Sequence, residues 1–291
     1  MGEFPIAHRR LRANGIELHV AEAGAADGPL LVLLHGFPEF WFAWRHYMPA
    51  LAELGFHVVA PDQRGYNLSD KPRGIGAYGL DLLADDIAEL TGGLGYDSFQ
   101  VVGHDWGGSV AWSLASRHAS RLQRMVVLNA PHPAVWVRAM TDDPDQRRKS
   151  GYVRFLQIPF VPEAMIRLGR YDGLAKSFAT ARGEAFTAET MQAYHHAWRM
   201  PGALTATLNY YRALLRKPMT MPAPGSLSPP CIILWGDDDP YGVRNLAEKS
   251  AVLCAKAEVV HLPGVGHWII HDARETVLAH LQRFLIQPQR G

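Results

Sequence analysis

Apolar positions along this chain follow two spacings that alternate in a regular order. Short runs that are apolar at nearly every position, such as residues 29–34, 99–102 and 231–235, predict strands buried on both faces. Residues 41–55 and 80–94 instead place apolar side chains three or four positions apart, which is typical of helices. This alternation of strand and helix predicts a mainly parallel sheet covered by helices on both faces.

The alternation stops after residue 128. From residue 129 to about residue 224 no convincing strand pattern occurs, and prolines and glycines separate helix-like pieces rich in Tyr, Trp, Phe, Arg and Met. This aromatic content is too high for a disordered linker. We therefore expect an α/β core made of residues 1–130 and 225–291, interrupted by a helical cap at residues 131–224.

A glycine-flanked turn, Gly-His-Asp-Trp-Gly at residues 103–107, joins a predicted strand to a predicted helix. Strand, sharp turn and helix are the parts of a nucleophile elbow, in which the central side chain is held out for reaction. Here the central residue is Asp105, which predicts chemistry in which a carboxylate attacks carbon. The alternative is an ordinary turn in which Asp105 only caps the helix.

A carboxylate that forms an ester needs a base to activate water, and the base needs an orienting acid. In the elbow architecture these partners come later in the chain, on loops that follow strands. His267 lies beyond the last predicted strand and is the expected base. The acid is expected to be Asp239, because a residue before proline is extended and turned away from the turn. Asp237 and Asp238 stay open as alternatives.

The tetrapeptide His-Gly-Phe-Pro at residues 35–38 follows the third predicted strand. The elbow architecture places a backbone donor there, so the N–H groups of Phe37 and Trp106 would point at one oxygen, that of the Asp105 carboxylate as it becomes tetrahedral. The alternative is a plain strand-end turn, with Pro38 in the cis form.

These motifs resemble those of the α/β-hydrolase fold epoxide hydrolases. The resemblance rests on motifs at residues 35–39, 62–72, 103–108, 236–239 and 264–268, which span the predicted core. The elbow in which Asp is followed by Trp is the most specific of them.

Epoxide hydrolases of this family also carry two cap tyrosines that hold the epoxide oxygen. The segments around Tyr152 and around Tyr211, rather than Tyr210, resemble the positions of these tyrosines. Tyr171 and Tyr194 also lie in the predicted cap and compete for the same role.

The resemblance implies an enzyme that converts a small hydrophobic epoxide to a vicinal diol without a metal or an organic cofactor. Asp105 would form a hydroxyalkyl ester with the substrate, and His267, oriented by Asp239, would drive water onto that ester. The tentative pocket residues are Phe37, Trp106, Phe155 and Trp268. Other large side chains are expected either to line the pocket or to belong to the core: Trp112, Trp136, Trp198, Phe160, Met165 and Phe178.

Other functions of the same fold fit the sequence less well. Haloalkane dehalogenases share the aspartate nucleophile, but they commonly have a polar donor where this chain has Phe37, and their acid can sit where this chain has Asn129. Fluoroacetate-type dehalogenases favour arginine at the position of Trp106. Asp105 disfavours a serine esterase, and an intact set of catalytic residues disfavours a non-catalytic binding protein.

The composition limits the remaining classes of function. The chain has 29 Lys plus Arg against 28 Asp plus Glu, which gives no reason to expect nucleic acid or a charged membrane surface as a partner. Its apolar runs are too short to cross a bilayer. Cys231 and Cys254 are too few for a disulfide framework and are expected to be small buried hydrophobes. We expect a soluble cytoplasmic protein, either a monomer or a homodimer.

Overall fold

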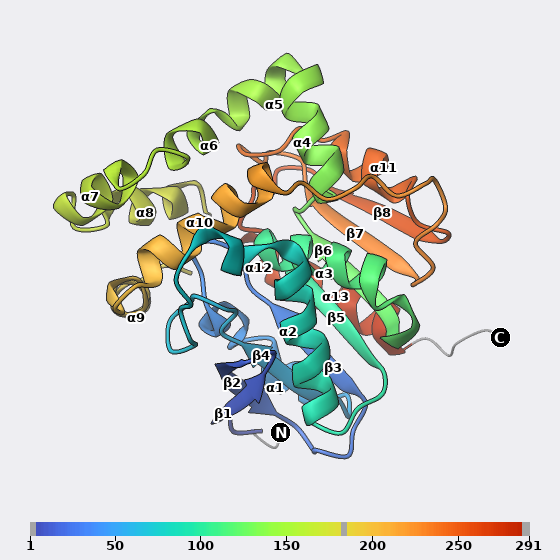
Figure 1. The fold of residues 1–291 in the computed structure, drawn as a ribbon. Helices are drawn as coiled ribbons and strands as arrows, with labels where there is room; N and C mark the ends of the chain where they lie inside the picture. The colour runs from blue at the N-terminus through green and yellow to red at the C-terminus, as the bar shows by residue number, and fades with distance from the viewer. Residues whose placement is uncertain (1–3, 182–184, 287–291) are drawn as a thin grey trace.

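The computed structural model describes residues 4–181 and 185–286, and an eight-stranded sheet forms its centre (Figure 1). The strand order is β1-β2-β4-β3-β5-β6-β7-β8. In this spatial order, each pair of neighbouring strands from β4 through β3 to β8 is parallel, whereas β2 pairs antiparallel with both β1 and β4. The mainly parallel sheet is therefore confirmed. Its strands are β1 (Ala7–Ala13), β2 (Ile16–Ala23), β3 (Leu30–Leu34), β4 (His57–Pro61), β5 (Phe99–His104), β6 (Leu122–Leu128), β7 (Cys231–Gly236) and β8 (Ala257–Leu262).

Helices cover both faces of the sheet, which explains why strands such as β3 are apolar at every position. In β3, Leu30, Val32 and Leu34 pack on one face, and Leu31 and Leu33 pack on the other, because successive side chains of a strand alternate. The first face is covered by α2 (Leu80–Gly93), α3 (Trp106–Arg117) and α11 (Leu246–Ala251). The second is covered by α1 (Met48–Ala52), α12 (Ile269–Asp272) and α13 (Arg274–Ile286).

The segment between β6 and β7 is helical, and we call residues 133–216 the helical insertion. Figure 1 shows it as a separate group of helices along the upper side of the sheet. Its α-helices within the described ranges are α4 (Pro133–Asp142), α5 (Pro144–Lys149), α6 (Gly151–Leu156), α7 (Val161–Leu168), α8 (Asp172–Ser177), α9 (Ala188–Arg199) and α10 (Ala203–Arg216). Short 3-10 helices occur at Trp41–Trp44, Ile75–Tyr78, Ala119–Arg121 and Phe178–Thr180.

The prediction of one helix over residues 41–55 is wrong. The segment forms a 3-10 helix at Trp41–Trp44 and then α1, with Pro49 in the first turn of α1. Proline lacks the N–H that a helix interior requires but is accommodated in a first turn, so a new helix begins just before it. The three- and four-residue spacing survives because both pieces bury the same side of the chain against the sheet.

Two expectations from composition can be compared directly with the fold. Cys231 and Cys254 are both buried, which agrees with the expectation that they are small buried hydrophobes. Among the described residues, no helix is long and apolar enough to span a membrane.

Candidate active site

Asp105 stands alone between the last residue of β5, His104, and the first residue of α3, Trp106. Its φ of 51° and ψ of −117° lie in a region that residues with a side chain rarely adopt, because the Cβ crowds the backbone. Its side chain makes no capping hydrogen bond to α3. The capping alternative therefore does not explain this strained turn, which leaves the carboxylate available for another role.

Gly103 and Gly107 allow β5 and α3 to approach each other at the turn. A Cβ on Gly103 would collide with the backbone of Gly107, and a Cβ on Gly107 would collide with the carbonyl group of Leu34. Both obstacles are backbone atoms, which cannot rotate out of the way. The glycines that flank Asp105 are therefore a steric requirement of the turn.

Replacing Gly107 by alanine is expected to lower the free energy of unfolding by about 3 kcal/mol or more, because backbone must move to admit the methyl group. Urea unfolding measures this change. The matched control is Gly93→Ala at the end of α2, where a Cβ meets open space and should stabilise by about 0.5–1 kcal/mol. Equal stabilities of the two variants would contradict the steric explanation.

The predicted partners of Asp105 converge on it from the loops after β7 and β8. His267 Nδ1 lies 2.8 Å from Asp239 Oδ2, and His267 Nε2 lies 3.7 Å from Asp105 Oδ2. His267 and Asp239 are buried. The neighbouring Asp237 instead lies 2.6 Å from His261 Nδ1, and Asp238 is exposed. Of the three predicted carboxylates, Asp239 is the one that contacts His267.

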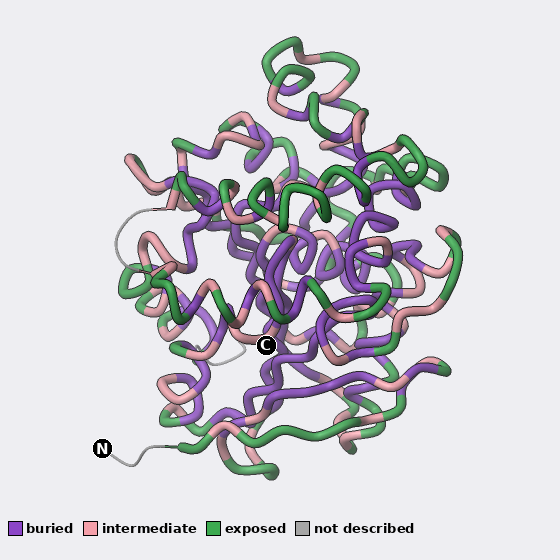
Figure 2. Tube along the Cα trace, turned by 90° about the vertical axis from the view of Figure 1, so that its left-hand side faces the viewer, coloured by how far each residue is buried: buried purple, intermediate pink, exposed green. Residues whose placement is uncertain are grey.

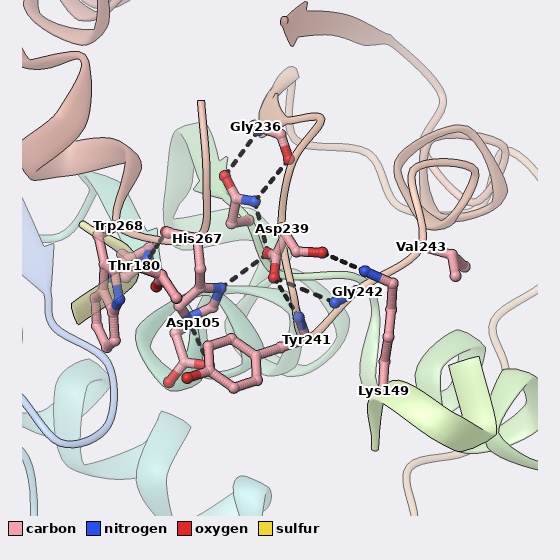
Figure 3. A network of polar contacts seen from close by, with 12 residues as sticks. Asp105, Lys149, Thr180, Gly236, Asp239, Tyr241, Gly242, Val243, His267 and Trp268 are labelled. Carbon is pink, nitrogen blue, oxygen red and sulfur yellow. Dashed lines mark hydrogen bonds and ion pairs between the residues drawn. The ribbon is translucent and has the colours of Figure 1, made fainter. Parts of the chain in front are cut away.

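Asp239 is surrounded by hydrogen-bond donors (Figure 3). The N–H groups of Tyr241 and Gly242 donate to its Oδ1 at 2.7 and 3.2 Å. Asn129 Nδ2 donates to its Oδ2 at 2.7 Å, and Asn129 Oδ1 accepts from the Gly236 N–H. Burial opposes ionisation, but His267 and these donors outweigh it and lower the pKa of Asp239. Asp239 therefore stays charged, and its two oxygens are held in place.

The backbone N–H of Phe37 donates to Asp105 Oδ1 at 2.8 Å. Gly36 makes this possible, since a Cβ there would lie 2.5 Å from the Cβ of Asp105. The peptide bond between Phe37 and Pro38 is cis. Of the two predicted backbone donors, Phe37 thus contacts the carboxylate, while Trp106 follows Asp105 as the first residue of α3.

Tyr152 of α6 and Tyr211 of α10 line the same cavity as Asp105 and His267. Their ring centroids are 5.9 Å apart, and Tyr211 packs edge-on against Trp106 at 4.9 Å. Tyr152 is 36% exposed as a residue, yet burial of its phenol raises the pKa of Tyr152, as burial also raises that of Tyr211. Both phenols therefore remain protonated near neutral pH and can donate hydrogen bonds.

The competing tyrosines point elsewhere. The hydroxyl of Tyr210 donates to the carbonyl oxygen of Arg64, and that of Tyr194 donates to Glu39. Tyr171 stacks on Trp198. The choice between adjacent residues 210 and 211 follows from the helix, which turns successive side chains about 100° apart.

The four tentative pocket residues do not all line the cavity that contains Asp105. Trp106 lines the cavity with Asp105, and Phe37 lines a second cavity together with residues of α8, α9 and α10. Phe155 and Trp268 line neither of them. Trp268 is buried behind His267, where its indole N–H donates to the carbonyl oxygen of Ser177.

The large side chains that were expected either in the pocket or in the core also lie in different places. Trp136 lines the cavity, whereas Trp112 is fully buried in the core. Phe160 and Met165 are 83% and 58% exposed, so they belong neither to the pocket nor to the core. Within the described ranges, no group of three or more His, Cys, Asp or Glu side chains could hold a metal ion.

A family model for the alpha/beta hydrolase fold matches residues 29–273 of this sequence. The chain belongs to the α/β-hydrolase fold family. An AB hydrolase superfamily protein of Bacillus subtilis, YfhM, is 44% identical over 90% of this chain and 92% of its own length. Epoxide hydrolase 2 of Caenorhabditis elegans is 33% identical over 96% of this chain and 79% of its own. The crystal structure of Bacillus megaterium epoxide hydrolase, 32% identical, covers 96% of this chain and 100% of its own with a TM-score of 0.86.

The hydrolase also contains a buried polar cluster that the sequence did not reveal. Glu39 is 1% exposed, and its Oε1 accepts from Tyr194 Oη at 2.8 Å and lies 2.7 Å from His271 Nε2. Its Oε2 lies 3.4 Å from His104 Nδ1, and the other ring nitrogen of His104 contacts the carbonyl oxygen of His267. These histidines lower the pKa of Glu39 despite its burial. A fixed negative charge therefore lies behind the His267 loop and is tied to α9.

The helical insertion of the hydrolase also holds the loop that carries Asp239. Gln146 of α5 is fully buried, donates to the carbonyl oxygen of Tyr241 and accepts from the N–H of Val243, both at 2.8 Å. Lys149 donates to the carbonyl oxygen of Asp239. No motif marks these residues, because their partners lie about 90 or more positions away along the chain.

Electrostatics favour a charged His267 in this hydrolase. Burial alone lowers the pKa of an imidazole, but the carboxylates of Asp239 and Asp105 outweigh it and raise the pKa of His267 to about 9. Since this value exceeds the unfolded value of about 6.5, the charge stabilises the fold fully below that pH. This contribution to stability is lost as the pH rises through about 9.

Proposed function

We propose that this hydrolase is an epoxide hydrolase that converts a hydrophobic epoxide to a vicinal diol through an ester on Asp105. The observation that carries the proposal is the pair of phenols, Tyr152 and Tyr211, in one cavity with a carboxylate that has no capping role. An epoxide needs this combination, because its alkoxide leaving group must receive a proton. Relatives named as epoxide hydrolases support the same assignment.

In the first step, one oxygen of Asp105 attacks an epoxide carbon, and the bond between that carbon and the epoxide oxygen breaks. Hydrogen bonds from Tyr152 and Tyr211 stabilise the developing alkoxide, and one phenol transfers its proton to it. The result is a hydroxyalkyl ester of Asp105. The pKa of each phenol is raised, so both are protonated near neutral pH, which supports this role.

In the second step, His267 removes a proton from water, and the hydroxide attacks the carboxyl carbon of Asp105. The N–H groups of Phe37 and Trp106 hold the oxyanion. The bond between this carbon and the alkoxy oxygen then breaks, and the imidazolium of His267 returns its proton to that oxygen, which releases the diol. The proton left on the Asp105 carboxyl group restores the phenol that was deprotonated in the first step. Asp239 stabilises the imidazolium that forms. The 2.8 Å contacts of Asp239 with His267, and of the Phe37 N–H with Asp105, support these roles.

We also propose that residues 131–224 form a cap on a core made of residues 1–130 and 225–291. The described helices α4 to α10 lie between β6 and β7, and they supply both tyrosines and the buried Gln146 contact to the Tyr241–Val243 loop. Residues 1–3, 182–184 and 287–291 of these ranges lie outside the described part of the chain.

A single turnover in heavy-oxygen water, with enzyme in excess over styrene oxide, tests the proposal. The first diol should contain no label, because its new oxygen comes from Asp105, and the label should be found in Asp105. A first diol that carries the label would contradict the covalent route. Halide release from chloroalkanes as fast as epoxide opening would instead favour a dehalogenase.

The two steps are expected to differ in their dependence on pH. Alkylation uses ionised Asp105, whereas ester hydrolysis needs neutral His267, whose pKa of about 9 falls once esterification removes the charge of Asp105. The hydrolysis rate should therefore decrease as His267 becomes protonated at lower pH, over a range where alkylation is still unchanged. Rapid-mixing measurements of the two phases check this, and identical pH profiles would contradict it.

A further inference from the structure

Exposed apolar side chains of the described chain concentrate on one part of the helical insertion. Eleven large hydrophobic residues are exposed within the described ranges, and five of them lie between residues 158 and 168. Figure 1 places α7 at the outer edge of the insertion, and Figure 2, which looks onto that side, has exposed segments across it. We call these five residues the α7 patch: Ile158, Phe160, Val161, Met165 and Leu168.

The polarity of α7 is inverted relative to an ordinary surface helix, which turns its apolar side inward. Val161, Met165 and Leu168 are spaced by four and three positions and are 42%, 58% and 85% exposed. Glu163 points inward and is 4% exposed, and its two oxygens accept from Arg212 at 2.7 and 3.0 Å. The inner side of α7 thus holds a buried ion pair next to Pro162 and Ile166, while three large apolar side chains of the helix are exposed on its outer side.

The loop before α7 is held in a way that increases this exposure. Phe160 is 83% exposed and has a φ of 63°, a conformation that is unfavourable for an aromatic residue. Arg212 also donates to the carbonyl oxygens of Leu156 and Ile158, so the loop has defined contacts. Neither packing nor local backbone preference accounts for a phenyl ring placed in water.

The charges around the α7 patch are mostly positive. The exposed charged residues from 154 to 176 are Arg154, Arg167, Arg170 and Lys176 against Asp172, a local excess of three positive charges. The net charge of the whole chain is only +1 and hides this excess. A second copy docked through a two-fold axis would bring these cations together, which argues against self-association. An anionic partner with an apolar interior satisfies both features of the patch.

We propose that the α7 patch docks on the surface of an anionic lipid bilayer. Phe160, Met165 and Leu168 would insert at the boundary between headgroups and acyl chains, and the arginines would contact lipid phosphates. The helix that precedes the patch, α6, carries Tyr152. If the function proposed above is correct, docking also brings the cavity close to the phase in which hydrophobic epoxides dissolve.

Sedimentation of the full chain with vesicles, without any substrate, tests the proposal. The chain should bind vesicles of phosphatidylcholine mixed with phosphatidylglycerol, and added salt should weaken the binding. Phe160→Ser combined with Leu168→Ser should lower the partition coefficient at least about tenfold, since both changes remove apolar area. Arg167→Gln combined with Arg170→Gln should lower it about tenfold. The controls Val252→Ser and Lys256→Gln, at exposed residues outside the helical insertion, should leave it unchanged.

Several outcomes would overturn the proposal. One is no binding to the anionic vesicles, and another is equal losses in the patch variants and the controls. A third is a dimer in sedimentation velocity that the Phe160→Ser, Leu168→Ser variant dissociates, because the patch would then be a subunit interface. Turnover of a water-soluble epoxide is measured separately, so a failed lipid proposal and a failed assignment of function can be told apart.

Discussion

Replacing His267 by glutamine is expected to stop turnover while still allowing one alkylation of each enzyme molecule. Steady-state diol formation should fall on the order of a thousandfold, because a general base contributes about 10²–10⁴-fold. Attack by Asp105 does not require the base, and the Phe37 N–H still holds the Asp105 carboxylate. The hydroxyalkyl ester should therefore accumulate, and intact-mass measurement should find the chain heavier by one substrate molecule.

Two further variants make the His267 experiment specific. Asp105→Ala should form no adduct and no diol, since it removes the proposed nucleophile. His261→Gln is the matched control, because His261 lies on β8 and contacts Asp237 and Glu248 rather than Asp105. It should retain turnover. A His267→Gln variant with normal turnover, or one that forms no adduct, would contradict the proposed division of the two steps.

Replacing Tyr152 and Tyr211 together by phenylalanine is expected to stop alkylation itself. Removing one preorganised donor costs about 10²–10³-fold, so losing both should lower the alkylation rate at least about 10⁴-fold. Each single variant should lose about 10²-fold, because one phenol can still donate. The measurement is the rate of ester formation under excess enzyme, followed by quenching and mass spectrometry.

Tyr210→Phe is the matched control for the tyrosine experiment. Its hydroxyl donates to the carbonyl oxygen of Arg64 and is fully buried, so its loss should cost about 1 kcal/mol of stability or more. Alkylation should proceed at a rate close to that of the unmodified enzyme. Near-full alkylation in the double variant would show that another acid protonates the alkoxide. Tyr241, which also lines the cavity 4.9 Å from the His267 ring, would be the next candidate.

The core strands were predictable because each is a local apolar run. A strand buried on both faces must be apolar at consecutive positions, as β3 and β7 are. The helix predicted over residues 41–55 failed because periodicity reports which side is buried, not whether the backbone continues through Pro49. Breaks of this kind depend on a single residue within an otherwise regular pattern.

The strained turn at Asp105 could be predicted because its cause is local. Two glycines and a central carboxylate lie within five residues, and the close approach of Gly103 to the backbone of Gly107 occurs within the turn itself. The same holds for the positions of His267 and Asp239, since loops that follow neighbouring parallel strands emerge at one edge of a sheet. Chain order and strand pattern were therefore enough to bring these residues together in the prediction.

The contacts of Asn129, Glu39 and Gln146 could not be predicted from the sequence. Each acts through a partner roughly 90 or more positions away: Asp239 for Asn129, Tyr194 for Glu39, and the carbonyl oxygen of Tyr241 for Gln146. The sequence shows only that Asn129 cannot serve as the acid. Its contact with the Asp239 carboxylate depends on the pairing of β6 with β7, which is a tertiary feature.

The sequence by itself determined the order of strands and helices, the turn that presents Asp105 and the chain positions of its partners. All of these follow from short-range sterics and from the burial of apolar runs. The sequence favoured Asp239 and Tyr211 over their neighbours, but the contact of Asp239 with His267 and the place of Tyr211 in the cavity are observed only in the tertiary structure. Only the tertiary structure shows that α7 turns large apolar side chains outward. Those features depend on how separate elements pack against one another. A local pattern determines the periodicity of a helix, but it does not determine which element each face of the helix contacts.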